Sequence, residues 1–329
     1  MFTKKITLIL YAILFVGAVL FPQIEKDDYI LHTAILSTIF VLLTMGLNLL
    51  VGFTGQLSLG HAAFFGVGAY VSAILTVTYG FNFWTAIFVA AIVSGAFGLC
   101  LGFPALKLKG PYLVMSTIGF VHIMHELFLN WYSVTRGAMG IVGIKFPPPI
   151  RLGSWSIDFS IPQNYFYLTL FWAVLGFIFL YTVIHSKIGR ALMAIRENDI
   201  AAECLGINLT RYKLFAFCTG ALFAGIAGSL YAHYISYISP DSFTLAESIN
   251  ILVMVIFGGM GTLMGPVIGA VTVTFLLENL RFLQEYRLII YGILLMLIII
   301  FAPGGLMGFI MKYVSARNSS KADLPQEGA

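Results

Sequence analysis

A polar, glycine-rich segment interrupts the apolar sequence between residues 51 and 61 and restricts the possible folds more than any other feature. Long apolar runs flank it on both sides. Backbone without helical hydrogen bonds survives at membrane depth only where protein buries it or a water-filled cavity meets it. We therefore expect an interrupted membrane helix that lines a path for a polar substrate. The residues assigned to this path are Gly52, Thr54, Gly55, Gln56, Ser58 and Gly60.

The composition requires lipid as a solvent. Hydrophobic residues make up 60% of the 329 residues, charged residues 10%, and the mean hydropathy is +0.96. A soluble domain cannot bury that much apolar surface. A transmembrane helix needs about 20 apolar residues, and runs approaching that length lie at 6–21, 29–51, 61–79, 84–103, 112–130, 165–184, 214–235 and 288–310.

Two shorter apolar runs, 249–257 and 266–277, either cross the membrane or form a re-entrant hairpin. We therefore predict an all-α polytopic membrane protein with eight to ten transmembrane helices and broken or re-entrant segments. The transmembrane permease domain is expected at residues 1–311 and a disordered cytoplasmic tail at 312–329. Within the domain, residues 131–162 are predicted to form an external loop and residues 185–213 a cytoplasmic segment.

The distribution of positive charge predicts the orientation. With the N-terminus in the cytoplasm and ten crossings, twelve basic residues fall inside: Lys4, Lys5, Lys107, Lys109, Lys187, Arg190, Arg196, Arg211, Lys213, Lys312, Arg317 and Lys321. Six fall outside: Lys26, Arg136, Lys145, Arg151, Arg281 and Arg287. Because cytoplasmic loops carry the excess of Lys and Arg, both termini are expected to be cytoplasmic.

A second glycine cluster, at residues 257–266, repeats the form of the first. Two glycine breaks in the two halves of a chain fit the internal repeats of transporters. The four residues assigned to the substrate path on this ground are Gly258, Gly259, Gly261 and Thr262. Pro266 alone could also explain a simple kink here.

The longest charged stretch on the predicted inner side runs from residue 186 to 207. Ile188, Leu192 and Ile195 share one helical face, and Gly206 is placed to end the helix. Its charges are mixed in sign, which favours docking to a protein groove over contact with anionic lipid.

Three ordered motifs resemble a known family. They are Gly52-x-x-Gly55-Gln56-Leu57-Ser58-x-Gly60-His61, then Gly189-Arg190-Ala191-x-x-Ala194-Ile195-Arg196-Glu197-Asn198, then Gly258-Gly259-x-Gly261-Thr262-x-x-Gly265-Pro266. Over about residues 30–310 the chain resembles the branched-chain amino acid permeases of bacterial ABC importers, of the LivM type. The segment Ala201-Ala202-Glu203-Cys204-Leu205-Gly206 is similar to the signature that inserts into an ATPase subunit in such importers. The resemblance thus implies ATPase coupling through Arg190, Arg196, Glu197, Asn198, Ala201, Ala202, Glu203 and Gly206.

The resemblance also implies the partners and the location. They are a second, homologous permease, two ABC ATPases, an extracytoplasmic binding protein and the lipid of a bacterial inner membrane, with no nucleic acid. The chain has no phosphate-binding Gly-x-x-x-x-Gly-Lys motif. We therefore expect no cofactor on this chain and expect ATP and magnesium to be bound by the ATPases.

Ionisable residues occur within one predicted span, at His122, His125 and Glu126. Such residues are functional suspects by default, although a polar helix end near the outer surface is the simpler interpretation. Metal binding needs more ligands than this stretch offers, so no metal site is predicted. The resembled family more usually has an acid and a base here than paired histidines, which leaves the role of the segment open.

Other functions stay open at this level. Permeases for urea or amides share the family pattern, and an autonomous secondary transporter could hold substrate and sodium with broken helices. A purely structural scaffold is a third class. No catalytic constellation stands out, so an enzyme is not expected.

Overall fold

The computed structural model describes residues 16–25, 27–105, 108, 110–152, 155–280, 292–293, 296 and 304–308. Most of the first and last predicted spans, and the whole predicted tail at 312–329, lie outside these residues. The helices are α2 (Asp28–Thr54), α3 (His61–Val77), α4 (Phe83–Ala105), α5 (Pro111–Asn130), α6 (Tyr132–Thr135), α7 (Pro162–His185), α8 (Lys187–Glu197), α9 (Asp199–Cys204), α10 (Leu209–Ile235), α11 (Leu245–Gly258) and α12 (Gly265–Asn279). Short 3-10 helices are η1 (Gly137–Met139) and η2 (Pro240–Phe243), and the strands are β1 (Ile141–Val142), β2 (Ile150–Leu152), β3 (Trp155–Ile157) and β4 (Tyr237–Ile238).

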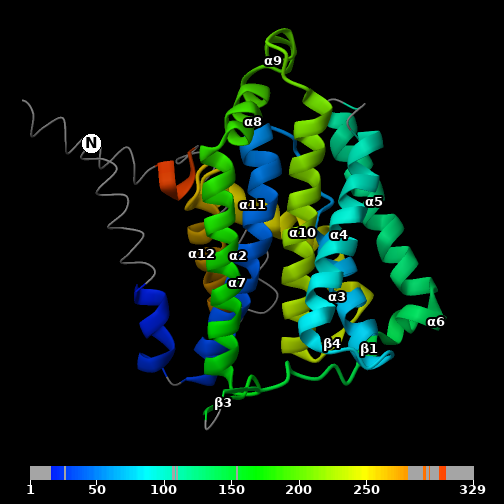
Figure 1. Cartoon of the computed structure of the whole chain (residues 1–329), viewed down its shortest axis with the longest axis vertical. Coiled ribbons are helices and arrows are strands. Elements are labelled where there is room, and N and C mark those ends of the chain that lie inside the picture. The colour runs from blue at the N-terminus through cyan, green and yellow to red at the C-terminus, as the bar shows by residue number, and fades with distance from the viewer. Residues whose placement is uncertain are drawn as a thin grey trace, which may run out of the picture.

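The long helices form one bundle with two distinct ends (Figure 1). We call the end that carries α8 and α9 the α8 end, and the end that carries the strands the β1 end. Six described segments are long and apolar enough to cross a membrane, namely α2, α4, α5, α7, α10 and residues Pro240–Gly258, and α3 and α12 are shorter apolar helices. The chain is therefore an all-α, multi-pass membrane protein. Successive long helices run in alternating directions between the two ends of the bundle (Figure 1).

Short strands cover the β1 end. β1 pairs antiparallel with β4, and β2 with β3, so the predicted external loop at 131–162 is partly ordered structure. His233, at the end of α10, fastens this loop to the bundle. Its Nδ1 lies 2.6 Å from the carbonyl oxygen of Lys145, and its Nε2 lies 3.1 Å from the Ser72 hydroxyl of α3.

The helices differ sharply in how much of them is covered. In α2, 89% of the most apolar 18-residue stretch is buried, against 28% of that stretch in α5. α2 is thus the central helix, and α5 lies at the edge of the bundle with one face open (Figure 1).

Glycines let α3, α4 and α10 touch through their backbones. A Cβ on Gly68 of α3 would lie 2.4 Å from the carbonyl oxygen of Gly225 in α10, and one on Gly228 would lie 2.2 Å from that of Phe65. In lipid, helices associate through van der Waals contact and lack a hydrophobic drive, so small residues at the interface are the main source of close packing.

A matched glycine pair in α4 tests this packing. A Cβ on Gly98 would lie 2.6 Å from Ala221 Cβ, whereas the nearest atom to a Cβ on Gly95 is 3.6 Å away, an ordinary contact. We expect Gly98→Ala to lower the free energy of unfolding by about 1–3 kcal/mol because it overpacks the interface. Gly95→Ala should leave the unfolding free energy unchanged or raise it slightly. Thermal unfolding of the purified protein in detergent measures both, and equal stability of the two variants would contradict the packing described.

Candidate functional site

The first glycine-rich segment ends α2 and forms a break. Gly52 and Thr54 still belong to the last turn of α2, and Gly55, with φ +71°, takes the left-handed conformation that commonly ends a helix. The Gly55 N–H and the Thr54 hydroxyl both donate to the Leu50 carbonyl. Residues 55–60 then run without helical structure until α3 begins at His61.

The break carries the chain back into the bundle, so that α3 starts about halfway across. A Cβ on Gly46 of α2 would lie 3.3 Å from His61 Nε2, and one on Gly220 of α10 would lie 3.7 Å from His61 Cε1. Gly46 lies about 12 Å from the end of α2, at 1.5 Å per residue. α3 therefore occupies only the half of the bundle nearer the β1 end (Figure 1).

A second half-length helix meets α3 at this depth. The backbone N–H of Ala62, in the first turn of α3, donates to the hydroxyl of Ser248, in the first turn of α11, at 3.0 Å. α3 runs from there to the β1 end and α11 runs to the α8 end. Two helix N-termini, each carrying a partial positive charge, thus meet inside the bundle.

The polar side chains of the break are largely buried. Ser58 is 1% exposed, and its hydroxyl accepts from the Gly60 N–H at 3.2 Å. The Leu59 N–H donates to the Thr117 hydroxyl of α5 at 3.0 Å. Gln56 is 7% exposed, and its Oε1 has no hydrogen-bond partner among the described residues.

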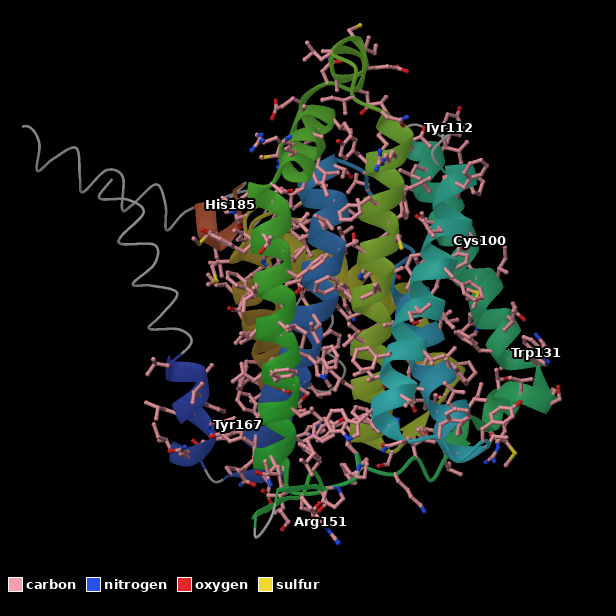
Figure 2. The ribbon with its side chains drawn as sticks, viewed as in Figure 1. Cys100, Tyr112, Trp131, Arg151, Tyr167 and His185 are labelled. Carbon is pink, nitrogen blue, oxygen red and sulfur yellow. The ribbon has the colours of Figure 1, made fainter. Side chains whose placement is uncertain are left out.

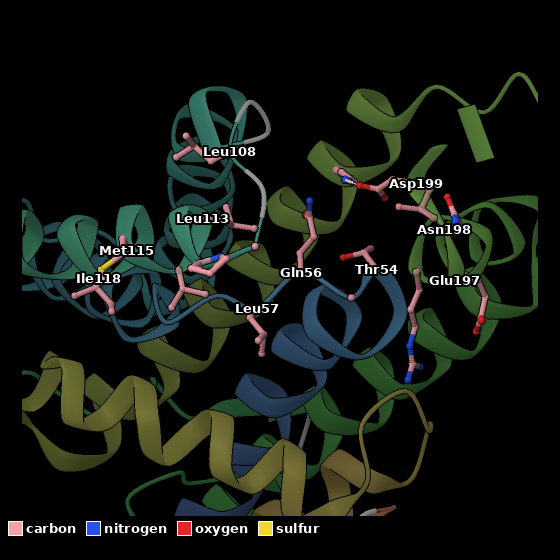
Figure 3. Close-up of a pocket in the computed structure, with 17 residues that line it drawn as sticks. Thr54, Gln56, Leu57, Leu108, Leu113, Met115, Ile118, Glu197, Asn198 and Asp199 are labelled. Atoms are coloured by element: carbon pink, nitrogen blue, oxygen red, sulfur yellow. Dashed lines mark hydrogen bonds and ion pairs between the residues drawn. The ribbon is translucent and has the colours of Figure 1, made fainter. Parts of the chain in front are cut away.

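A cleft of about 600 Å³ opens beside the break at the α8 end. Thr54, Gly55, Gln56 and Leu57 form one wall. The start of α5 and residues 195–199 at the junction of α8 and α9 form the others. Figure 3 shows Gln56 projecting between the α5 residues on one side and Asp199 and Asn198 on the other.

The second glycine cluster lies elsewhere than the first. Residues 259–264 form the turn between α11 and α12 at the α8 end, and Asn48 of α2 holds this turn. Asn48 Oδ1 accepts from the Gly261 N–H at 2.9 Å, and its Nδ2 donates to the Thr262 carbonyl at 2.8 Å. Gly258, Gly259, Gly261 and Thr262 do not line the 600 Å³ cleft, and their assignment to the substrate path stays a prediction.

The segment predicted to couple to an ATPase is two helices, where one was expected. Asn198 separates them in an extended conformation (φ −161°, ψ 113°), and its side chain accepts from the N–H groups of Ile200 and Ala201 to cap α9. Asp199 accepts from Lys213 of α10 at 2.7 Å, and Ala202 is buried. The other residues assigned to coupling are exposed at the α8 end: Arg190, Arg196, Glu197, Asn198, Ala201, Glu203 and Gly206.

Although exposed overall, Arg196 also reaches into the bundle. Its Nη1 donates to the Gly52 carbonyl at 2.6 Å. The predicted coupling segment and the first break are therefore in direct contact. Sequence patterns gave no sign of this contact, because the two residues are 144 positions apart.

One face of the apolar helix α5 carries exposed polar side chains. His122, Glu126 and Asn130 are exposed, and the Asn130 amide donates to Glu126 Oε2 at 2.8 Å. His125 lies 3.8 Å from the carboxylate of Asp241 in η2. Tyr112 and Trp131 mark the two ends of this helix in Figure 2. The helical spacing of residues 122, 126 and 130 is the sequence signal for this shared face, and the polar helix end near the outer surface stays a prediction.

A multi-pass helical bundle with an interrupted helix beside a cleft is the architecture of a membrane transport protein. Residues 29–299 match the family described as branched-chain amino acid transport system, permease component. The chain belongs to this family, as the resemblance implied, and is an inner-membrane permease component.

Curated relatives agree with the family. The chain is 37% identical to the high-affinity branched-chain amino acid transport permease LivM of Salmonella typhimurium, over 93% of this chain and 76% of that protein. It is 35% identical to LivM of Escherichia coli, over 97% and 79%. The related permease LivH of Escherichia coli is 25% identical over 83% and 92%. No solved protein structure matches the chain significantly.

Cysteine labelling tests whether water fills the cleft, because a residue in a water-filled cleft and a residue that faces lipid differ in their access to water. Leu57 in the cleft and Leu175 in the middle of α7 are similarly exposed, at 48% and 47%. In a background with Cys100, Cys204 and Cys218 replaced by Ser, we expect Leu57→Cys to react with a hydrophilic maleimide in inside-out vesicles. Leu175→Cys should stay unreactive because a thiol in lipid does not ionise. Equal labelling of both cysteines would show that the cleft is not a water-filled vestibule.

Proposed function

We propose that this chain is one transmembrane subunit of an ATP-driven importer that carries branched-chain amino acids into the cytoplasm. The observation that carries the proposal is the broken helix beside a cleft, in a chain of the branched-chain amino acid permease family. A permease for urea or amides is not favoured, because the LivM relatives named above are branched-chain amino acid permeases. The relatives are transport proteins, and we assign no enzymatic step to this chain.

The importer needs further subunits. LivM and LivH relatives both match this chain, which supports a pair of homologous permeases. We propose two ATPase subunits that bind ATP and magnesium, and an extracytoplasmic protein that delivers the substrate. The exposed part of α8 and α9 is the surface on which an ATPase would act.

The open face of α5 supports the placement of the path. Ionisable side chains such as Glu126 are expensive in lipid and normally face the interior of a bundle or a water-filled cavity. We propose that the second permease covers this face and that the substrate passes between the two subunits. The polar residues of α5 would then line the outer half of the path, and Gln56 with the 600 Å³ cleft would line the inner half.

The two helix N-termini that meet near Ala62 and Ser248 fit the charge of the substrate. An amino acid carries a carboxylate, which partial positive charges at helix ends stabilise without a buried full charge. We propose that the aliphatic side chain of the substrate passes close to Phe120 of α5, whose ring packs on the buried Phe64 of α3 with centroids 5.2 Å apart.

Reconstitution tests the function. In proteoliposomes that contain both permeases and the ATPases, with the binding protein outside, we expect uptake of radiolabelled leucine that requires ATP, and little uptake of urea. The chain alone should carry no substrate, because it contains no ATP-binding motif and lacks half of the path. Leucine uptake by this chain alone would instead indicate an autonomous transporter.

Cysteine labelling tests the α5 path. Glu126 on α5 and Ile92 on α4 are both exposed in this chain. In the assembled importer, without native cysteines, Glu126→Cys should react with a small hydrophilic thiol reagent at least about tenfold faster than Ile92→Cys, since each unit of pKa increase in lipid lowers the thiolate fraction tenfold. Glu126→Cys that reacts as slowly as Ile92→Cys would place α5 against lipid or dry protein.

A further inference from the structure

The Arg196 side chain, in the last turn of α8, lies against both glycine-rich breaks. Its Nη1 donates to the Gly52 carbonyl of α2 at 2.6 Å. A Cβ on Gly261 would lie 2.1 Å from the same nitrogen, so the guanidinium rests directly on the backbone of the α11–α12 turn. A Cβ on Gly55 would lie 3.4 Å from Arg196 Cγ. Three backbone positions thus enclose one side chain.

The position suits an arginine for two physical reasons. The last four carbonyls of a helix lack an intrahelical partner, and Gly52 is among those of α2. The C-terminal end of a helix also carries a partial negative charge that a cation stabilises. A guanidinium is compact across its plane and always charged, so it can donate to Gly52 while it packs beside Gly261.

The two breaks that Arg196 contacts are joined to each other. Asn48, which is 1% exposed, bonds to both Gly261 and Thr262. The end of α2 and the α11–α12 turn therefore form one hydrogen-bonded unit. Among the described residues, the Arg196 bond is the only side-chain hydrogen bond from α8 to this unit.

This unit continues directly into the wall of the cleft. Thr54, Gly55, Gln56 and Leu57 follow Gly52 in sequence and line the cleft together with Arg196. Beyond Arg196, the exposed α9 is tied to α10 through the Asp199–Lys213 ion pair. A displacement of α8 and α9 from outside would therefore reach the wall formed by residues 54–57 through Arg196.

We infer that Arg196 is a positioning residue that transmits movement of α8 to the inner wall of the cleft and so couples ATP hydrolysis to substrate passage. The inference rests on the proposed function, in which ATPase subunits act on α8 and α9. Arg196 itself need not contact an ATPase. Its role is to hold the end of α2 and the α11–α12 turn to the moving helix.

The test measures leucine uptake per ATP hydrolysed by the complete importer in proteoliposomes. The coupling between two sites in a protein typically amounts to about 5- to 150-fold, and on that scale we expect Arg196→Gln to lower uptake per ATP about tenfold while the ATPases still copurify. Arg196→Lys should give an intermediate ratio, because an ammonium can donate to Gly52 but cannot also cover Gly261. Arg211→Gln is the matched control. It removes the same guanidinium from the exposed first turn of α10, outside α8 and α9, and should keep the wild-type ratio.

Each other outcome has a distinct meaning. If Arg196→Gln loses the ATPases during purification, Arg196 is a docking residue and the inference is wrong. A wild-type ratio in Arg196→Gln also overturns it. Should Arg196→Gln fail to accumulate in the membrane, Arg196→Lys decides, and a wild-type ratio there contradicts the inference. A wild-type importer that shows no ATP-dependent uptake would refute the proposed function instead.

Discussion

Lipid supplies no hydrogen bonds, so every backbone group freed by a helix break in this protein needs a partner in the protein or in a water-filled cavity. The end of α2 shows how the requirement is met: the Gly52 carbonyl accepts from Arg196, and the Leu50 carbonyl accepts from Thr54 and Gly55. At the start of α3 the Ala62 N–H donates to the Ser248 hydroxyl. Arg196 and Ser248 belong to α8 and α11, which are distant in sequence from the break. The need to satisfy the breaks therefore determines which elements lie next to them.

The sequence predicted the long helices well, because apolar runs in a membrane protein leave few alternatives. The expected spans at 84–103 and 112–130 correspond to α4 and α5 almost residue for residue. The predicted helix boundaries were wrong where a polar residue belongs to a helix. The run expected to begin at residue 249 begins at Leu245, because Glu247 in the first turn of α11 hides the start. An acid there is favoured by the partial positive charge of the helix N-terminus.

The candidate site was predicted only in part, for a physical reason. Composition can reveal that the membrane helix is interrupted between Gly52 and Gly60, but it cannot reveal the depth of the break or its hydrogen-bond partners. Depth depends on where the returning chain meets α2 and α10, which the contacts of His61 with Gly46 and Gly220 record. Likewise, the sequence predicted that Asn198 lies inside one continuous amphipathic helix. Its side chain prefers to cap a new helix, as Asn does at N-cap positions.

The two glycine breaks are similar in sequence but have different surroundings. They therefore differ in the hydrogen bonds that they can offer to water or to a solute. The first leads from the α8 end to the middle of the bundle, and along it lie an unpartnered Gln56 oxygen and a cleft. The second is a closed turn whose polar groups are paired within the protein: Thr262 accepts from the Gly265 N–H and donates to the Gly259 carbonyl. Among the described residues of the two breaks, Gln56 is the one whose buried side-chain oxygen has no hydrogen-bond partner, so the first break can offer this oxygen to water or to a passing solute. Hydrogen bonds within the second turn and those from Asn48 of α2 together hold its shape. A rigid turn bonded to α2 through Asn48 can shift as a body, and the cleft wall that continues from α2 must shift with it.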